Sequence, residues 1–212
     1  FLGSGLEKVT FENGMTRIPS NLFVGCENLT QVIIPDSVTE IGNHVFYNCT
    51  NLSQVTLSNN LKQLGYGSFA NCTALKKIEI PKSLTEFGSP EDTISYNTLG
   101  PFGNSGLNTV TFEEGITTIA EELFADCNSL TEIIIPDSVT EINNRAFQNC
   151  TNLRNVKLSK NLSTIEWDAF YNCTALEEIE IPKSLSGSYN SGQFAESGLK
   201  TVTFEDGTTS IP

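Results

Sequence analysis

The sequence predicts an α/β repeat solenoid, a single domain built from stacked coils that each repeat one short pattern. The pattern Leu-x-x-Val/Ile-x-apolar begins nine times, at Leu6, Leu29, Leu52, Leu75, Leu107, Leu130, Leu153, Leu176 and Leu199. Successive starts lie 23 residues apart except for one step of 32 residues. Self-similarity at a fixed period of this size is the signature of a repeat architecture. One coil cannot bury its apolar face alone, so neighbouring coils must cover it.

A longer period lies above the first. The segment LTQVIIPDSVTEI at 29–41 returns as LTEIIIPDSVTEI at 130–142, and LKKIEIPKSL at 75–84 returns as LEEIEIPKSL at 176–185. We therefore expect two four-repeat blocks, an insertion that accounts for the long step, and the start of a third block. The bounds of the blocks are 6–106 and 107–198, the insertion covers 88–103, and the third block starts at 199. The whole chain, 1–212, is expected to be one solenoid fragment of a longer array.

Each coil is expected to contain a strand, a turn and a return. Leu29, Val32 and Ile34 have the alternating spacing of a strand, and Pro35 follows where a missing N–H donor costs least. The position of Ser37 holds only Gly, Ser or Asn in all nine repeats, which are residues that favour turns. A second short extended piece and a short helical or irregular return should complete the coil.

Stacking predicts columns of identical buried side chains. One column should be aromatic, formed by Phe23, Phe46, Phe69, Phe124, Phe147 and Phe170. The six cysteines fall at the same 23-residue steps, at Cys26, Cys49 and Cys72 and again at Cys127, Cys150 and Cys173. Buried thiols that pack as small hydrophobic groups are the favoured interpretation. Disulfides between neighbouring coils and a metal site remain alternatives, although no CxxC spacing supports a metal.

The charge balance excludes some partners. Asp and Glu outnumber Lys and Arg 25 to 12, which gives a formal net charge of -13. Nucleic acid and anionic membranes attract basic residues, so neither is an expected partner. An acidic surface suits a cationic partner, or it only keeps the protein soluble. No stretch reaches the roughly 18 apolar residues of a membrane span, and no signal peptide is present, so membrane insertion is not expected.

With these residues laid out, the segment LTQVIIPDSVTEIGNHVFYNC at 29–49 resembles the BspA-like, or treponemal-type, leucine-rich repeats. The resemblance extends over all nine repeats and departs in the insertion 88–103 and in the eighth repeat. It implies a right-handed leucine-rich-repeat superhelix with a parallel sheet on its concave face. It further implies a bacterial or protist cell-surface or secreted protein of adhesin-like character that contacts host proteins or other cells.

Catalytic residues, cofactors and metal ligands are not expected. His44 is the only histidine, and its equivalent in the second block is Arg145, so we interpret the position as exposed surface and not as a general base. Adjacent carboxylates such as Glu177-Glu178 would point to opposite faces of a strand. The repeated Asn-Cys-Thr sequons, as at Asn48, are interpreted as turn residues.

The outward side chains of the sheet are the candidate binding residues. On the concave face these are Gln31, Ile33, Thr56, Glu79, Glu132, Ile134, Lys157 and Glu180, and in the inserted loop Tyr96. Ile33 and Ile134 stand out, because an apolar residue in a polar outward row indicates a contact site. The alternative is that β-branched residues simply suit strands. The expected function is recognition of a protein outside the cell; a structural spacer and a targeting appendage of an enzyme elsewhere in the full-length chain are the rivals.

Overall fold

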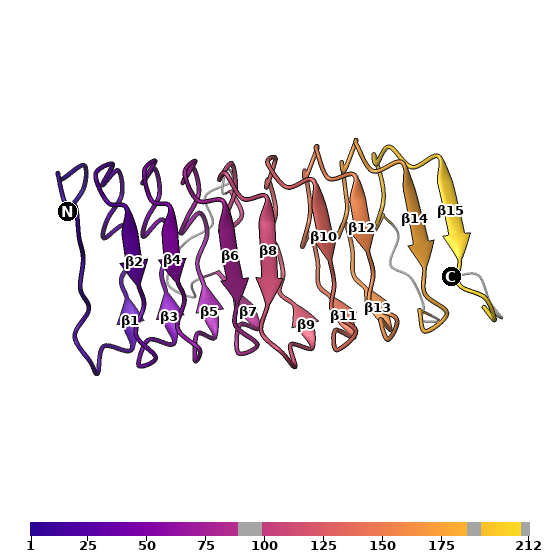
Figure 1. The fold of residues 1–212 in the computed structure, drawn as a ribbon, viewed down its shortest axis with the longest axis horizontal. Coiled ribbons are helices and arrows are strands. Elements are labelled where there is room, and N and C mark those ends of the chain that lie inside the picture. Colours follow the sequence, from indigo (N-terminus) through magenta and orange to yellow (C-terminus); the bar gives the residue numbers. More distant parts are fainter. Residues whose placement is uncertain (89–98, 186–191, 209–212) are drawn as a thin grey trace.

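The computed structural model describes residues 1–88, 99–185 and 192–208. Over these ranges the chain forms an elongated solenoid of parallel strands in two rows, with no helix (Figure 1). The expected α/β class is therefore wrong in its helical part. Each return contains residues in the left-handed region, such as His44 at φ 53° and Asn48 at φ 59°, and a right-handed helix cannot pass through them. The returns are turns.

The longer strands form the first row, called the strand face from here on. Its members are β2 (Gln31–Ile33), β4 (Gln54–Thr56), β6 (Lys77–Ile80), β8 (Thr109–Phe112), β10 (Glu132–Ile134), β12 (Asn155–Lys157), β14 (Glu178–Ile181) and β15 (Thr201–Phe204). Each strand comes from one coil, and neighbouring strands in the row come from successive coils (Figure 1).

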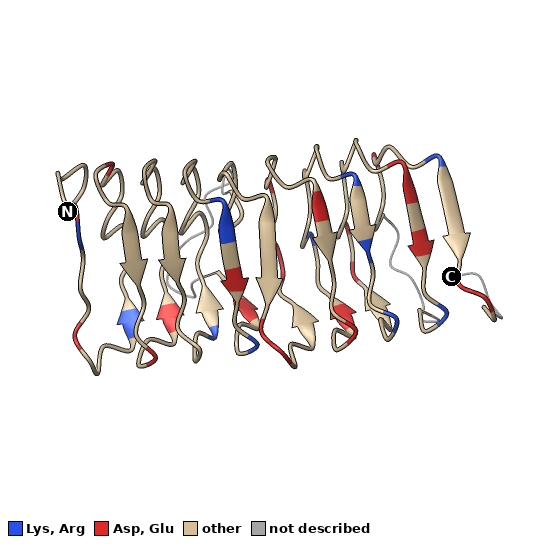
Figure 2. Ribbon diagram, in the orientation of Figure 1, with Lys and Arg blue, Asp and Glu red and all other residues tan. Residues whose placement is uncertain are grey.

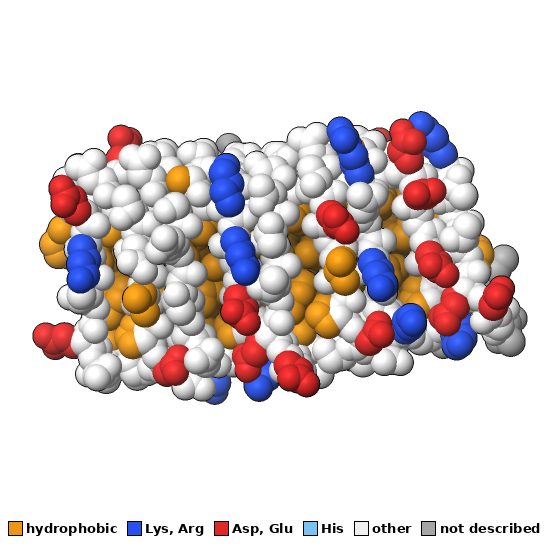
Figure 3. Space-filling model, in the orientation of Figure 1, with side chains coloured by type: hydrophobic (Ala, Val, Ile, Leu, Met, Phe, Trp, Pro, Cys, Tyr) orange, Lys and Arg blue, Asp and Glu red, His pale blue; other side chains and the backbone are white. Residues whose placement is uncertain are grey.

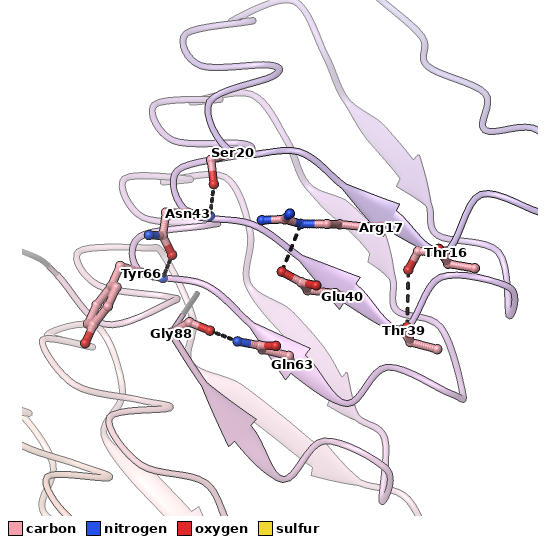
Figure 4. Close-up of polar contacts among 9 residues, drawn as sticks. All are labelled: Thr16, Arg17, Ser20, Thr39, Glu40, Asn43, Gln63, Tyr66 and Gly88. Carbon is pink, nitrogen blue, oxygen red and sulfur yellow. Dashed lines mark hydrogen bonds and ion pairs between the residues drawn. The ribbon is translucent and has the colours of Figure 1, made fainter. Parts of the chain in front are cut away.

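Strands of two residues form the second row, after the turn of each coil. They are β1 (Arg17–Ile18), β3 (Glu40–Ile41), β5 (Gln63–Leu64), β7 (Glu86–Phe87), β9 (Thr118–Ile119), β11 (Glu141–Ile142) and β13 (Thr164–Ile165). This row has two unbroken ladders, β1-β3-β5-β7 and β9-β11-β13. Side chains reinforce the first ladder between coils (Figure 4). The Asn43 N–H donates to Ser20 Oγ at 3.0 Å, and Asn43 Oδ1 accepts from the Tyr66 N–H at 2.8 Å.

The register of the strands confirms that equivalent residues stack. Gln31 pairs with Gln54, which is 23 residues further along the chain. Lys77 pairs with Thr109 across the long step, so the extra residues leave the sheet register intact. The sequence period thus sets which residues lie side by side.

The predicted aromatic column is confirmed. Successive rings stack with centroids 5.0 to 6.2 Å apart in an unbroken series of nine. Phe1, Phe102 and Phe194 continue the column in the coils where the regular spacing fails. The column and the strand residues on either side of it form one continuous core.

Asparagines at equivalent positions of the returns form columns in which one side chain hydrogen-bonds to the next. Asn48, Asn71, Asn149 and Asn172 all have φ between 58° and 60°, a conformation that Asn tolerates better than most residues. The side chains also bond from coil to coil, with Asn71 Nδ2 donating to Asn48 Oδ1 at 2.8 Å and Asn172 Nδ2 donating to Asn149 Oδ1 at 3.0 Å. These roles account for the repeated sequons as structural turn residues.

Candidate functional site: the strand face

The structure places all eight predicted concave-face residues on the strand face, and all are exposed. Strand alternation explains this placement, because Val32 and Ile133 point into the core while their neighbours point to solvent. Ile33 and Ile134 are 58% and 55% exposed, although they are large apolar residues. Ile33 lies beside Thr56, and Ile134 lies beside Lys157 in the same register. The two blocks therefore present an isoleucine at the same place.

The strand face carries charges of both signs (Figure 2). Among the outward residues of its eight strands are two lysines, Lys77 and Lys157, and four glutamates, Glu79, Glu132, Glu178 and Glu180. The difference is a net charge of about -2 on this face, against -13 for the chain. Spread over sixteen outward side chains, this charge makes the strand face no less acidic than the chain as a whole.

The strand face is not one continuous sheet, which the sequence interpretation missed. Its strands form separate ladders of two: β2-β4, β6-β8, β10-β12 and β14-β15 (Figure 1). No strand pairing joins β4 to β6, β8 to β10 or β12 to β14 in the described part of the chain. These three unpaired junctions are called the openings.

Proline at the strand ends of alternate coils marks the openings. Pro81, Pro136 and Pro182 each follow a buried, inward-pointing residue at the end of the strand on the C-terminal side of an opening. The carbonyl of Ile80 accepts from Glu113 N of the following coil, so residue 80 faces forward and residue 81 faces back toward the opening. Proline has no N–H to donate there. The prolines are visible in the sequence, but which strand pairing they prevent depends on the direction in which the missing backbone N–H would point.

Half-buried valines lie at the bottom of the openings. Val55, Val110 and Val156 are the inward residues of β4, β8 and β12, and each is only partly covered while packing against the core. The matching residues of the next strands, Ile78 and Ile133, are almost fully buried at 1% and 2% exposure. Figure 3 shows the result as stripes of hydrophobic side chains between the strands of the face.

A groove of about 370 Å³ lies over the opening between β12 and β14 and extends to outward side chains of β10 and β15. Its lining includes Val156 and Ile179, with Lys157 on one side and Glu178 and Glu180 on the other. The corresponding residue to Lys157 in the first block is Thr56, and that to Glu178 is Lys77. The two blocks therefore share the apolar bottom of the groove and differ in the charges at its rim.

Tyr96, the predicted loop residue, lies outside the described residues. Residues 99–103 on the far side of the insertion are described, and the peptide N–H of Phe69 donates to the carbonyl of Pro101 at 2.8 Å. The coil thus closes normally after the insertion.

His44 is half-buried, so its predicted exposure is wrong. Its ring lies edge-to-face on Tyr47 with centroids 5.5 Å apart, on a return that packs against the neighbouring coils. The equivalent Arg145 pairs with Glu122 at 3.2 Å and lies 4.7 Å over the ring of Trp167. Burial raises the pKa of the Glu122 carboxyl, and the hydrogen bond from Arg145 opposes that rise. Arg145 thus links its coil to both neighbours, while the His44 ring contacts a residue of its own return.

The six cysteines are buried free thiols, as the favoured interpretation predicted. The Cys72 thiol donates to the Phe46 carbonyl at 3.2 Å and the Cys173 thiol donates to the Phe147 carbonyl at 3.2 Å, so each links its coil to the previous one. Burial raises the pKa of the Cys49 and Cys173 thiols to about 12. In the described ranges, no cluster of three or more His, Cys, Asp or Glu side chains could hold a metal ion.

We expect these thiols to be unreactive in the native protein. At pH 8 a thiol with a pKa near 12 is ionised to about one part in 10⁴, and only the thiolate attacks a disulfide reagent. Ellman's reagent should therefore leave the Cys49 and Cys173 thiols unlabelled within minutes in buffer and label them in 8 M urea. Fast labelling of the native protein would show that the thiol columns open to solvent.

No helix of the described residues has the length and hydropathy of a membrane span. No curated protein sequence matches the chain. Among solved structures, a leucine-rich repeat protein from Eubacterium ventriosum ATCC 27560 is 24% identical, aligns over 92% of this chain and 59% of its own length, and has a TM-score of 0.64. The pneumococcal vaccine antigen PcpA is 22% identical over 100% of this chain and 60% of its own, with a TM-score of 0.49.

The first of these likenesses supports the fold, and this chain spans 59% of that neighbour's length. The family model of the BspA type leucine rich repeat region matches six copies, over residues 1–91 and 93–212. The matched ranges contain the coils, the phenylalanine column and the paired strands described above. Because that match extends over nearly the entire sequence, the protein belongs to the BspA-type leucine-rich repeat family.

Proposed function

We propose that this chain is a protein-recognition module and that the strand face is its binding surface. The observation that carries the proposal is the pair of exposed isoleucines, Ile33 and Ile134, at equivalent places on the two blocks. A large apolar side chain that is more than half exposed in a polar row favours a contact surface.

The proposal extends to the whole protein through the family. The module would belong to a bacterial cell-surface or secreted protein of adhesin-like character, with a protein of a host or another cell as its partner. The right-handed twist and the position of the strand face on the concave side are part of this proposal. The rival functions, a spacer and a targeting appendage, require no apolar residues on the strand face.

The test is competition for adhesion. Full-length parent protein, labelled with a fluorophore, is bound to host-cell monolayers, and soluble 1–212 is added as the competitor. We expect 1–212 to displace the parent. Failure to compete at any concentration would favour the spacer or the appendage.

Replacing both isoleucines by aspartate should raise the concentration needed for half-displacement at least about tenfold, since burying one isoleucine contributes about 1.5–3 kcal/mol and a tenfold change is 1.4 kcal/mol. The control is Met15→Asp, which changes a 37% exposed methionine in the turn before β1. The urea unfolding midpoints of both variants should match the midpoint of unsubstituted 1–212. An unchanged competition curve for Ile33→Asp/Ile134→Asp would remove the strand face from the proposal.

A further inference from the structure

We propose that the partner of the strand face is an α-helix that lies lengthwise along the solenoid and places an apolar side chain over each opening. The inference rests on the proposed function and names the class of partner. It uses a second feature, independent of the exposed isoleucines: the strands of the strand face are hydrogen-bonded only in pairs. The three openings, β4/β6, β8/β10 and β12/β14, recur once every two coils.

The distance between successive openings follows from the strand spacing. Each interval contains one hydrogen-bonded step of about 4.8 Å and one unpaired step that is wider. The unpaired step has an upper limit, because Cα atoms of β4 and β6, of β8 and β10, and of β12 and β14 still approach within 8 Å. The openings therefore repeat every ~10 to ~13 Å along the solenoid.

An α-helix matches this interval at seven residues. A rise of 1.5 Å per residue separates positions i and i+7 by about 10.5 Å, and two turns return the side chain to nearly the same face. A polyproline II helix repeats every three residues, at about 9.3 Å, which is shorter than the interval. An extended strand places side chains of one face about 6.7 Å apart at two residues and about 13.4 Å apart at four, which lie below and just above the interval. The spacing thus favours a helix.

The apolar residues at the bottom of the openings also favour contact with an apolar side chain of the partner. Val55, Val110 and Val156 expose part of their side chains at the bottom of the openings, and covering them removes apolar surface from water. The groove at β12/β14 is open to solvent on the strand face and has room for a branched side chain at about 370 Å³. Similar stripes follow the other two openings in Figure 3.

The charged residues beside the openings indicate which charged residues the helix should carry on either side of its apolar stripe. Glu79 lies on β6, and Glu132 lies on β10, while Lys157 and Glu180 face one another across the last opening. A helix with both lysine and glutamate beside its apolar stripe can pair with each of these rims. We therefore choose a partner of near-zero net charge.

The experiment uses synthetic 21-residue peptides of Ala, Glu, Lys and Gln with three leucines each. The test peptide has leucine at positions 4, 11 and 18, which are spaced by about 10.5 Å. The matched control has leucine at positions 7, 11 and 15, on the same helix face but spaced by about 6 Å. A third peptide is proline-rich with leucine at every third residue. Circular dichroism establishes that the first two are equally helical.

Binding to 1–212 is measured by fluorescence anisotropy. We expect the seven-residue spacing to bind at least tenfold more tightly than the four-residue spacing. Equal affinities, or no binding by any of the peptides, would overturn the inference, because helix amphipathicity alone would then explain the result or no helix would be accepted. Tighter binding of the proline-rich peptide would replace the helix by a polyproline partner.

A variant of the protein tests the openings directly. Val55→Thr/Val110→Thr/Val156→Thr keeps the shape of each side chain and adds a hydroxyl that remains half-exposed. We expect this variant to bind the peptide with the seven-residue leucine spacing at least tenfold more weakly. Its affinity for the control peptide should be unchanged. Thr118→Val, in β9 of the second row and off the strand face, is the matched control and should change neither affinity. Unchanged affinity in the triple variant, with an unchanged urea midpoint, would contradict the role of the openings.

This result separates the inference from the proposed function. Suppose that Ile33→Asp/Ile134→Asp abolishes competition, but the peptides with seven-residue and four-residue leucine spacing bind with equal affinity. The strand face then recognises a partner that is not a lengthwise helix. If the peptide binds by its spacing and the isoleucine variant still competes, the openings take helices but the parent adheres through another surface.

Discussion

Phe147→Ala should lower the free energy of unfolding by about 3–5 kcal/mol. Phe147 is 0% exposed, and its ring stacks between those of Phe124 and Phe170 with centroids 5.3 and 5.0 Å away. The substitution leaves a cavity that the flanking coils cannot close, because ladders on both rows hold the following coil and the second-row ladder holds the preceding one. It also removes two aromatic contacts.

Chemical denaturation followed by far-ultraviolet circular dichroism measures the effect. Phe204→Ala is the control, since this phenylalanine of β15 is 38% exposed and should cost less than about 1 kcal/mol. In a solenoid each coil contacts only its neighbours, so a defect in a middle coil should also broaden the transition or divide it in two. A loss below about 1 kcal/mol for Phe147→Ala would mean that the column is not the main stabilising element.

The stacking of coils could be predicted from the sequence because a constant period determines which residues are neighbours. Ile41 and Leu64 are 23 residues apart and lie side by side in β3 and β5. The phenylalanine and cysteine columns follow from the same step. The exposure of Ile33 and Ile134 was predictable in the same way, since alternation along a strand decides which side chains point outward.

The α/β class and the single continuous sheet were wrong expectations for a different reason, whereas the irregular form of the returns was among the expected alternatives. A return of a few residues can be a helical turn or an irregular one, and only the left-handed φ of residues such as His44 and Arg145 decides between them. The division into strand pairs depends on which way the missing N–H of Pro81 points, and that requires the register. Neither property is visible in a residue type alone.

Gly106→Ala should destabilise the protein by about 3 kcal/mol, at the upper end of the cost of overpacking. A Cβ at this position would lie 2.1 Å from the carbonyl oxygen of Thr73 and 2.5 Å from Lys76 Nζ. The φ of Gly106 lies outside the left-handed region, so the cost comes from the collision and not from the backbone conformation. The flexible lysine can move away, whereas the Thr73 carbonyl belongs to the previous coil and cannot.

Gly5 provides a matched control within the same chain. It precedes Leu6 as Gly106 precedes Leu107, but a Cβ there would meet only Asn28 Nδ2 at 3.6 Å, an ordinary contact. Gly5→Ala should therefore leave the urea midpoint unchanged, and Gly198→Ala, which also places its Cβ 2.1 Å from a threonine carbonyl, should repeat the loss. Equal stability of Gly106→Ala and the parent chain would show that the coils can separate here. Because the coil at Gly106 is one residue shorter between phenylalanine and leucine than the cysteine-containing coils, its turn lies closer to the coil before it, and glycine is what that approach requires.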